Sequence, residues 1–373
     1  MSTEKKNWLS VLAFFIVLVM ILALLSAIFN VKSVDTWPSS RVTCGFYEEP
    51  ENSLDVLYFG TSHIMCGVSP MRIWQEHGIT GYSIATERQY MGLTYYWIQE
   101  TFKYQSPKLV VLDAMTLFAW PFSDFESRQR KALDYMKMSS VKRDAIKAVC
   151  NYSEDADPLS YYIPFVAYHD RWSMLTESDF TFPFEDKKYL NKGFYMCYEG
   201  IGTNFSAPFY TSSGDIDPLS QATLDYFHLI RQLCKENGAQ LLLVQMPRSV
   251  EWTVEKHDLV ASMAEAYGFD FLDLGTDEAL ADLRFDPLMD MYDPWHVSSF
   301  GADKVSLALG DYIAANYKFD AHSQEIIDSW NDDLVVFNQN AEADAIFRIQ
   351  ERERLAREAE EAAAAQALED LRD

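Results

Sequence analysis

The sequence predicts an α/β fold in which helices cover both faces of a mostly parallel sheet, preceded by one membrane-spanning helix. Short apolar runs without polar alternation recur along the chain, and stretches with helical spacing separate them. Strands of that kind are buried on both faces, which is typical of parallel sheets wrapped by helices. A long uncharged run near the N-terminus predicts the membrane helix.

The bulk composition limits the class of protein. With 373 residues, of which 49% are apolar and 23% charged, the chain can form a large core and is not disordered. Its 56 Asp and Glu against 31 Lys and Arg give a net charge of −25, which argues against nucleic acid as a partner because phosphates would be repelled. The cysteines form no CxxC pair; one disulfide could form, and we predict no metal and no cofactor.

Residues 8–29 (WLSVLAFFIVLVMILALLSAIF) carry no charge, and a helix of about 20 apolar residues crosses a bilayer. Lys5 and Lys6 precede the run, which favours an N-terminus on the inside. A signal peptide is the alternative, but its apolar region usually spans about 7–15 residues and ends at an A-x-A-like site, which is not evident here. We expect a retained single-pass anchor in the cell membrane. Under both interpretations residues from 31 onward are exported.

The regions of the chain follow from these patterns. We expect a cytoplasmic stub and anchor at 1–30, a juxtamembrane spacer at 31–53 and a main domain at 54–335. Within the main domain, strands are expected at 54–57, 107–113, 239–246 and 269–274. Helices are expected at 95–104, 221–236 with a stop at Asn237-Gly238, 250–267, and from about Ser299.

Two regions differ from the strand–helix pattern. Residues 120–215 are aromatic and loop-rich, and we interpret them as an insertion between strands. Residues 336–373 form an acidic tail of Ala, Glu and Arg without Gly or Pro, which predicts a helix. Its apolar positions are mostly alanine, too small for a strong coiled-coil seam. We expect a solvated or partly frayed helix, with a partner-binding helix as the alternative.

The first strand runs into Gly-Thr-Ser-His within YFGTSHIMCG (58–67), which leaves two interpretations of Ser62. A serine in a strand-to-helix loop commonly caps the helix, because its hydroxyl accepts a hydrogen bond from an orphan backbone N–H. It can also be a nucleophile at the end of a sheet, although the G-x-S-x-G signature is absent. The local sequence favours the cap.

Residues far along the chain change that balance. Asp293 and His296 lie three positions apart in MYDPWHVSSFGADKVS, just before a predicted helix. On such a turn the carboxylate can orient the imidazole and stabilise its charged form. A surface pair is the ordinary interpretation of an isolated Asp-x-x-His. In an open parallel sheet, however, ligands bind at the carboxyl ends of the strands, and Ser62 follows the first strand while this loop follows the last.

Together the two motifs resemble the SGNH/GDSL hydrolase superfamily. The similarity is greater to its membrane-anchored, extracytoplasmic branch in bacteria, in which Gly-Thr-Ser-His replaces Gly-Asp-Ser and which includes DltD-like and alginate-acetylation-like proteins. It spans roughly residues 54–316, through VLYFGTSH, GYSIATERQYMGLTYYWIQETFKYQSPKLVVLD, LLLVQMPRSVEW and DPWHVSSFGADKVS. The resemblance implies a flavodoxin-like, three-layer α/β/α SGNH fold.

The resemblance also implies a mechanism. Ser62 would attack an acyl carbonyl, His296 would take and return its proton, and Asp293 would hold the imidazole tautomer. The chain departs from the family at the oxyanion donors, because LDAMTLF after the second strand lacks the usual Asn and Arg88 stands where a glycine is usual. Backbone N–H groups after Ser62 are natural donors, and Gln89 matches a glutamine of the closer branch.

Four further polar residues are candidates for the oxyanion or substrate site, each with a structural alternative. His63 adjoins the nucleophile and is interpreted as supporting. Asp113 ends the second strand and either faces the site or caps a helix. His169 could line the site from the insertion or be structural. Arg248 follows the third strand and either binds an anionic substrate or lies on the surface.

The function that the resemblance implies is acyl transfer, with acetyl as the expected group, to or from hydroxyls of a cell-envelope polysaccharide or teichoic acid. The family further implies a membrane-bound O-acyltransferase as partner. The alternatives are an esterase that removes acyl groups and a non-catalytic glycan-binding scaffold, which the missing Asn favours.

Overall fold

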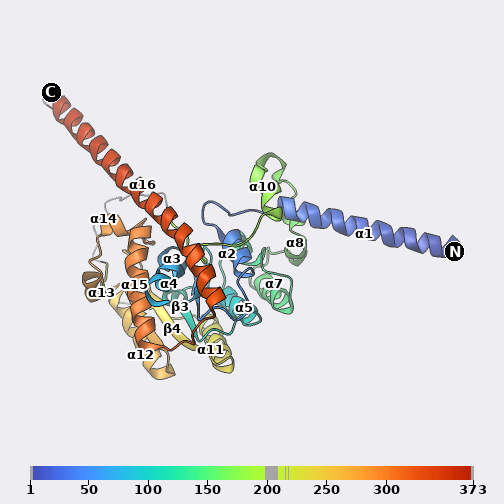
Figure 1. Cartoon of the computed structure of the whole chain (residues 1–373), viewed down its shortest axis with the longest axis horizontal. Helices are drawn as coiled ribbons and strands as arrows, with labels where there is room; N and C mark the ends of the chain where they lie inside the picture. Colours follow the sequence, from blue (N-terminus) through green and yellow to red (C-terminus); the bar gives the residue numbers. More distant parts are fainter. Residues whose placement is uncertain (1–2, 198–208, 215, 217, 371–373) are drawn as a thin grey trace.

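The computed structural model has a five-stranded sheet in which all strands are parallel, as the sequence predicts (Figure 1). It describes residues 3–197, 209–214, 216 and 218–370. The strand order β2-β1-β3-β4-β5 means that the chain reverses its direction of winding between β1 and β3. The strands are β1 (Val56–Gly60), β2 (Gly81–Ala85), β3 (Leu109–Asp113), β4 (Gln240–Gln245) and β5 (Asp270–Asp273).

Helices make up most of the remaining described chain. Those before β3 are α1 (Thr3–Phe29), α2 (Ser39–Phe46), α3 (Ser62–Gly67), α4 (Pro70–His77) and α5 (Met91–Thr101). Those between β3 and β4 are η1 (Ala114–Phe118), α6 (Glu126–Leu133), α7 (Ser140–Tyr152), α8 (Pro158–Tyr162), α9 (Pro164–Tyr168), η2 (Arg171–Met174), α10 (Glu177–Thr181), η3 (Phe182–Phe184) and α11 (Gln221–Glu236). Those after β4 are α12 (Val254–Tyr267), α13 (Asp277–Asp282), α14 (Pro287–Asp290), α15 (Ser299–Asn316) and α16 (Gln324–Asp370).

Two groups of helices pack against the sheet. α15 contacts α3 and α4, whereas α5 contacts α11, and Figure 1 shows β3 and β4 between α15 and α11. Every residue of β1 and β3 is buried. This burial on both faces explains why these strands are continuous apolar runs.

The sequence analysis missed one strand, β2. Its sequence, GYSIA, begins with glycine and has few β-branched or aromatic residues. Tertiary contacts hold it instead, because β2 pairs with β1 along its length and Ser83 N donates to Lys192 O at 2.9 Å on its other side. The four predicted strands and the four predicted helices of the main domain are present.

Residues 31–53 are packed into the domain, so the prediction of a spacer is wrong. Helix α2 lies against β2, and Val42 and Phe46 are fully buried there. The hydroxyl of Tyr82 donates to Val42 O at 2.9 Å. These apolar side chains cover strand β2 at the edge of the sheet, which gives the segment a structural role that its prolines and charges conceal.

The C-terminal helix α16 begins at Gln324, before the predicted boundary at 336, and one face of its first half is buried. Trp330 and Phe337 are buried against the domain, and the rings of Trp74 and Trp330 lie 5.3 Å apart. Beyond this region the helix projects from the body of the protein (Figure 1). The solvated helix that the composition of the tail predicts is therefore found only in the outer part of α16.

A buried lysine joins three distant segments. Nζ of Lys192 lies 2.8 Å from Glu49 Oε1 and 2.9 Å from Asp333 Oδ2, and all three side chains are buried. Glu49 follows α2, Lys192 belongs to the insertion and Asp333 to α16. Removing one member would leave buried charge unpaired, so the three segments stabilise one another.

Helix α1 projects from the domain and exposes apolar side chains on all sides (Figure 1). Its segment Asn7–Phe29 is long and apolar enough to cross a membrane. The insertion is more helical than expected, since α6 to α10 lie within it. None of the five cysteines forms a disulfide: Cys44, Cys66, Cys150, Cys197 and Cys234.

Gly60→Ala is expected to destabilise the protein strongly. Gly60 has φ +154°, and an added Cβ would lie 2.4 Å from Cβ of the buried Asp113. We expect a loss of about 3 kcal/mol or more in the free energy of unfolding, because backbone strain adds to the overlap. Urea unfolding measures this loss. Gly78→Ala is the matched control: φ is +63° with no atom within 4 Å, so only about 1 kcal/mol should be lost. Equal losses would contradict the prediction.

Candidate active site

Ser62 is the first residue of α3, directly after the turn that ends β1. Thr61, not Ser62, is the N-cap: its side chain accepts a hydrogen bond from His63 N at 3.3 Å. The capping role that the sequence suggests for Ser62 therefore belongs to Thr61. The hydroxyl of Ser62 points to another partner.

Ser62, His296 and Asp293 form a continuous hydrogen-bonded chain. Ser62 Oγ lies 2.8 Å from His296 Nε2, and His296 Nδ1 lies 2.9 Å and 2.8 Å from the two carboxylate oxygens of Asp293. When Nδ1–H donates to Asp293, Nε2 carries the lone pair that accepts the proton of the Ser62 hydroxyl. The arrangement has the geometry required to activate a serine as a nucleophile.

The loop of Asp293 and His296 is held rigidly. Asp293 Oδ1 also accepts hydrogen bonds from the backbone N–H groups of Trp295 and His296, both at 2.8 Å. Burial alone would raise the pKa of Asp293, but the hydrogen bond and charge of His296 with the two backbone donors outweigh it and lower that pKa. Asp293 is therefore ionised at neutral pH, and it can stabilise the positive charge that His296 gains.

The start of α15 packs against the segment that precedes this loop. Gly301 approaches so closely that a Cβ there would lie 2.1 Å from Asp290 O. Nζ of Lys304 lies 2.6 Å from the buried carboxylate of Asp290, and Ser298 Oγ donates to Met289 O at 2.6 Å. Gly301 and Lys304 thus dock α15 against the segment that leads to Asp293.

Asp113 binds the turn that carries Ser62. Its carboxylate Oδ2 accepts from the Thr61 hydroxyl at 2.6 Å and lies 3.2 Å from His63 Nδ1. Oδ1 accepts from Met115 N at 3.1 Å, so Asp113 also caps η1. Asp113 therefore both contacts the turn of the candidate site and caps a helix, which the sequence analysis had given as alternatives. His63 is oriented by this contact, and its ring centroid lies 5.5 Å from that of His296.

The charges around His63 favour its neutral form. Burial lowers the pKa of His63, and the positive charge of Arg248 lowers it further, against the opposing effect of Asp113. Burial would raise the pKa of Asp113, but the hydrogen bonds from His63 and from the Thr61 hydroxyl and the charge of Arg248 outweigh it and lower that pKa. A neutral His63 that donates from Nδ1 to an ionised Asp113 satisfies both directions.

Arg248 is buried, contrary to the alternative of a surface arginine. Its Nη2 donates to Glu251 Oε2 at 2.5 Å and its Nε to Val250 O at 2.7 Å. Its Nη1 is buried without a hydrogen-bond partner among the described residues. The positive charge of Arg248 lowers the pKa of His63 and of Asp113, and the charge of Asp293 acts on Arg248 in turn. An unsatisfied buried N–H of this kind can bind an anionic group of a ligand.

Gln89 and His169 are not placed as oxyanion donors. The amide of the buried Gln89 donates to Ile84 O at 2.9 Å and stabilises its own loop. His169 lies after α9, where Nδ1 is 2.9 Å from Val166 O. Among the described residues, no hydrogen bond or ring contact joins His169 to Ser62. His169 lies instead near the end of α1, because its ring contacts Phe165, which contacts Phe29. Arg88 has φ +56°, a conformation that favours glycine.

An aromatic residue that the sequence analysis did not single out, Trp37, contacts the site. Its ring centroid lies 5.1 Å from that of His296 and 5.3 Å from that of Tyr195. Trp37 has φ +49°, which is a strained conformation for a bulky residue. It belongs to the segment predicted to be a spacer, and no periodic pattern there marks it. Trp37 shields one side of the imidazole from solvent.

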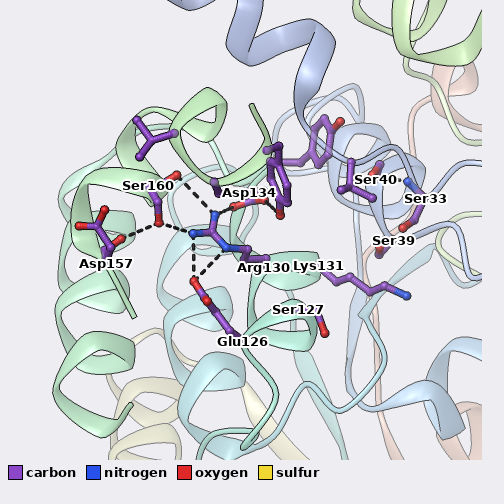
Figure 2. A pocket seen from close by; sticks show the side chains of 15 residues that line it. Ser33, Ser39, Ser40, Glu126, Ser127, Arg130, Lys131, Asp134, Asp157 and Ser160 are labelled. Atoms are coloured by element: carbon purple, nitrogen blue, oxygen red, sulfur yellow. Dashed lines mark hydrogen bonds and ion pairs between the residues drawn. The ribbon is translucent and has the colours of Figure 1, made fainter. Parts of the chain in front are cut away.

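A separate cavity of about 460 Å³ lies between the chain after α1 and helices α6, α8 and α9 (Figure 2). Arg130 points into it and is bound by Glu126, Asp134 and Ser160, as the dashed lines in Figure 2 mark. None of the predicted site residues lines this cavity. Its charged side chains have partners within the protein, so the cavity does not identify a ligand.

No family model matches the sequence, and no curated protein matches it. Among the residues that the structure describes, no group of three His, Cys, Asp or Glu side chains could hold a metal ion. The function therefore has to be argued from the geometry of Ser62, His296 and Asp293.

Arg248→Gln is expected to raise the pKa of His63. The substitution removes a positive charge that disfavours the protonated imidazole, so the pKa should move up toward its ordinary value. Titration of isotope-labelled histidine by NMR measures the change in the full chain in micelles. Arg248→Lys keeps the charge and should leave the pKa of His63 near that of the unsubstituted protein. A His63 pKa that does not respond to Arg248→Gln would show that burial alone sets it.

Proposed function

We propose that this protein is a membrane-anchored serine enzyme of the SGNH type that transfers an acyl group through an acyl-enzyme. The observation that supports this proposal is the hydrogen-bonded chain from Ser62 through His296 to Asp293, at the carboxyl edge of a parallel sheet. A parallel sheet binds its ligands at that edge. The three-layer α/β/α SGNH architecture is part of the same proposal.

In the first half-reaction, Ser62 Oγ attacks the acyl carbonyl as His296 Nε2 takes the hydroxyl proton. The tetrahedral intermediate collapses when His296 returns that proton to the leaving oxygen, and the acyl group remains as an ester on Ser62. In the second half, a hydroxyl of the acceptor loses its proton to His296 and attacks the ester. Ser62 recovers its proton and the acceptor leaves acylated.

The oxyanion needs donors that do not depend on the missing Asn. The N–H of Ser62 lies in the first turn of α3, where backbone N–H groups have no partner within the helix. The partnerless Nη1 of Arg248 is a second source of positive charge. We propose that these two groups stabilise the intermediate, with Arg248 in the role that an amide has in other members of the superfamily.

The anchor suggests the substrate class. A domain held at the outer surface of a cell membrane lies beside envelope polymers as they are assembled, and an acetyl group on a polysaccharide or teichoic acid fits a serine acyl-transfer mechanism. Lys5 and Lys6 favour a single-pass topology with the N-terminus inside. A membrane-bound O-acyltransferase that exports the acyl group is the partner that this role requires.

Ser62→Ala is expected to abolish the acyl-enzyme. The full chain in detergent is incubated with 4-nitrophenyl acetate, and peptide mass spectrometry should find acetyl on Ser62. Turnover of the ester should fall about 10³-fold or more in the variant, because the nucleophile is lost. Ser127→Ala removes an exposed hydroxyl on α6 and should change neither measurement. Two results together would overturn the catalytic proposal in favour of a glycan-binding scaffold. The unsubstituted protein would carry no acetyl on Ser62, and Ser62→Ala would not reduce turnover of the ester.

A second experiment separates transfer from hydrolysis. Addition of a deacetylated envelope polysaccharide or teichoic acid to the acylated protein should produce acetylated polymer at the expense of free acetate. Trp37 shields His296 from solvent, which favours a bound hydroxyl over water as the acceptor. Free acetate as the sole product, with every acceptor tested, would instead assign the protein as an esterase.

A further inference from the structure

The insertion exposes a group of large apolar side chains in the consecutive elements α9, η2, α10 and η3. Between 37% and 77% of each side chain is exposed, the highest value being that of Phe184. We call this group the collar: Val166, Trp172, Met174, Phe180 and Phe184. Single exposed apolar residues are ordinary on a protein surface, but several large ones in consecutive elements favour a contact with something apolar.

The collar adjoins the end of α1. The ring of Phe29, the last residue of α1, lies 5.1 Å from that of Phe165 and 4.4 Å from that of Trp172. The backbone N–H of Phe165 donates to Ser26 Oγ at 3.3 Å. α10 also contacts α1, and Figure 1 shows it beside the point where α1 leaves the domain. The collar is therefore continuous with the apolar surface of α1.

A layer of charged side chains lies at the same level. Arg171 Nη1 donates to Phe29 O at 2.5 Å and pairs with Asp179 at 3.4 Å. Lys32 Nζ donates to Ala27 O and to other carbonyls at the end of α1, and it lies 3.6 Å from Asp179. These groups satisfy the last carbonyls of α1, as a helix end requires where it leaves hydrocarbon for the headgroup region.

The length of α1 gives the depth of the collar. The apolar segment Asn7–Phe29 has 23 residues, which at about 1.5 Å per residue is about 34 Å, close to the roughly 30 Å of a bilayer core. Phe29 therefore lies at the outer boundary of the hydrocarbon when α1 spans the membrane. Trp172, in ring contact with Phe29, lies at the interfacial depth where tryptophan is enriched.

We propose that the collar is a membrane-contact surface whose side chains enter the interfacial layer of the bilayer around α1. The domain is thereby held against the membrane at two places, by α1 and by the insertion, so its orientation is fixed. The inference rests on the anchorage included in the proposed function and is independent of acyl transfer. A bilayer is favoured over a protein partner because the collar continues the surface of a helix that is long and apolar enough to lie in a bilayer.

Charge does not drive this contact. In the segment 164–185, Arg171 is paired with Asp179, and Asp170, Glu177 and Glu185 add negative charge. The collar therefore binds by burial of apolar area, and neutral lipid suffices. This distinguishes it from a basic patch, which requires anionic lipid.

Photocrosslinking to lipid tests the proposal. The full chain is reconstituted in vesicles of phosphatidylcholine with p-benzoylphenylalanine in place of Trp172 or Phe184. The matched control carries the probe in place of Leu288 on α14, which is 43% exposed and outside the insertion. A third position, Val19 in α1, reports on the anchor itself. We expect lipid adducts at both collar positions at a yield close to that at Val19 and severalfold above that at Leu288.

The outcomes are distinct. Suppose that lipid adducts form at Val19, but that the yield at Trp172 and Phe184 is no higher than at Leu288. This result would overturn the proposal that the collar contacts lipid and would still support α1 as the anchor. Absence of adducts at Val19 would refute the anchor and with it the inference. Adducts to another protein or to a second copy, found in native membranes in place of lipid, would assign the collar to a protein interface and overturn the proposal.

Discussion

The buried carboxylate of Asp113 is the constraint on which the geometry around Ser62 depends. It binds the hydroxyl of Thr61 on one side and His63 on the other, the two neighbours of Ser62 in the chain. Gly60 lies against Asp113 across the β1–β3 pair without room for a Cβ. Each donor that an ionised buried carboxylate loses would cost free energy, so the turn has one stable conformation. The sheet itself, rather than a mobile loop, positions the hydroxyl.

The winding of the sheet brings the other groups to the same edge. The chain reverses its winding between β1 and β3, and sheets of this type bind their ligands beyond the carboxyl ends of the strands at such a reversal. The loop after β4 adds Arg248, and the next residue, Ser249, donates its N–H to Pro294 O at 3.0 Å. That bond joins the Arg248 loop to the loop of Asp293 and His296. The contacts of distant loops therefore reinforce one another.

Much of this arrangement could be predicted because it follows from periodicity and from one topological rule. Apolar runs without alternation identify β1, β3, β4 and β5, and the rule that strand ends share an edge relates Ser62 to His296 before any distance is known. What the sequence did not reveal depends on tertiary packing. β2 is held by pairing rather than by its own residues, and the burial of Arg248 comes from the loops around it. The N-cap of α3 is Thr61 and not Ser62. Both residues carry a hydroxyl that can cap a helix, so the sequence does not distinguish between these neighbours.

The contact between Trp37 and His296 joins the segment that follows α1 to the candidate site. A soluble form that began at β1 would lack both this ring and helix α2, which fills the core beside β2. Proteolytic shedding at the membrane surface would therefore have different consequences on either side of residue 37. A cut before Ser33 would release an intact site, whereas a cut after Pro38 would leave the imidazole open to water. An exchange of α1 for another N-terminal helix, or for a cleaved leader, would therefore have to preserve the segment from Ser33 to Phe46.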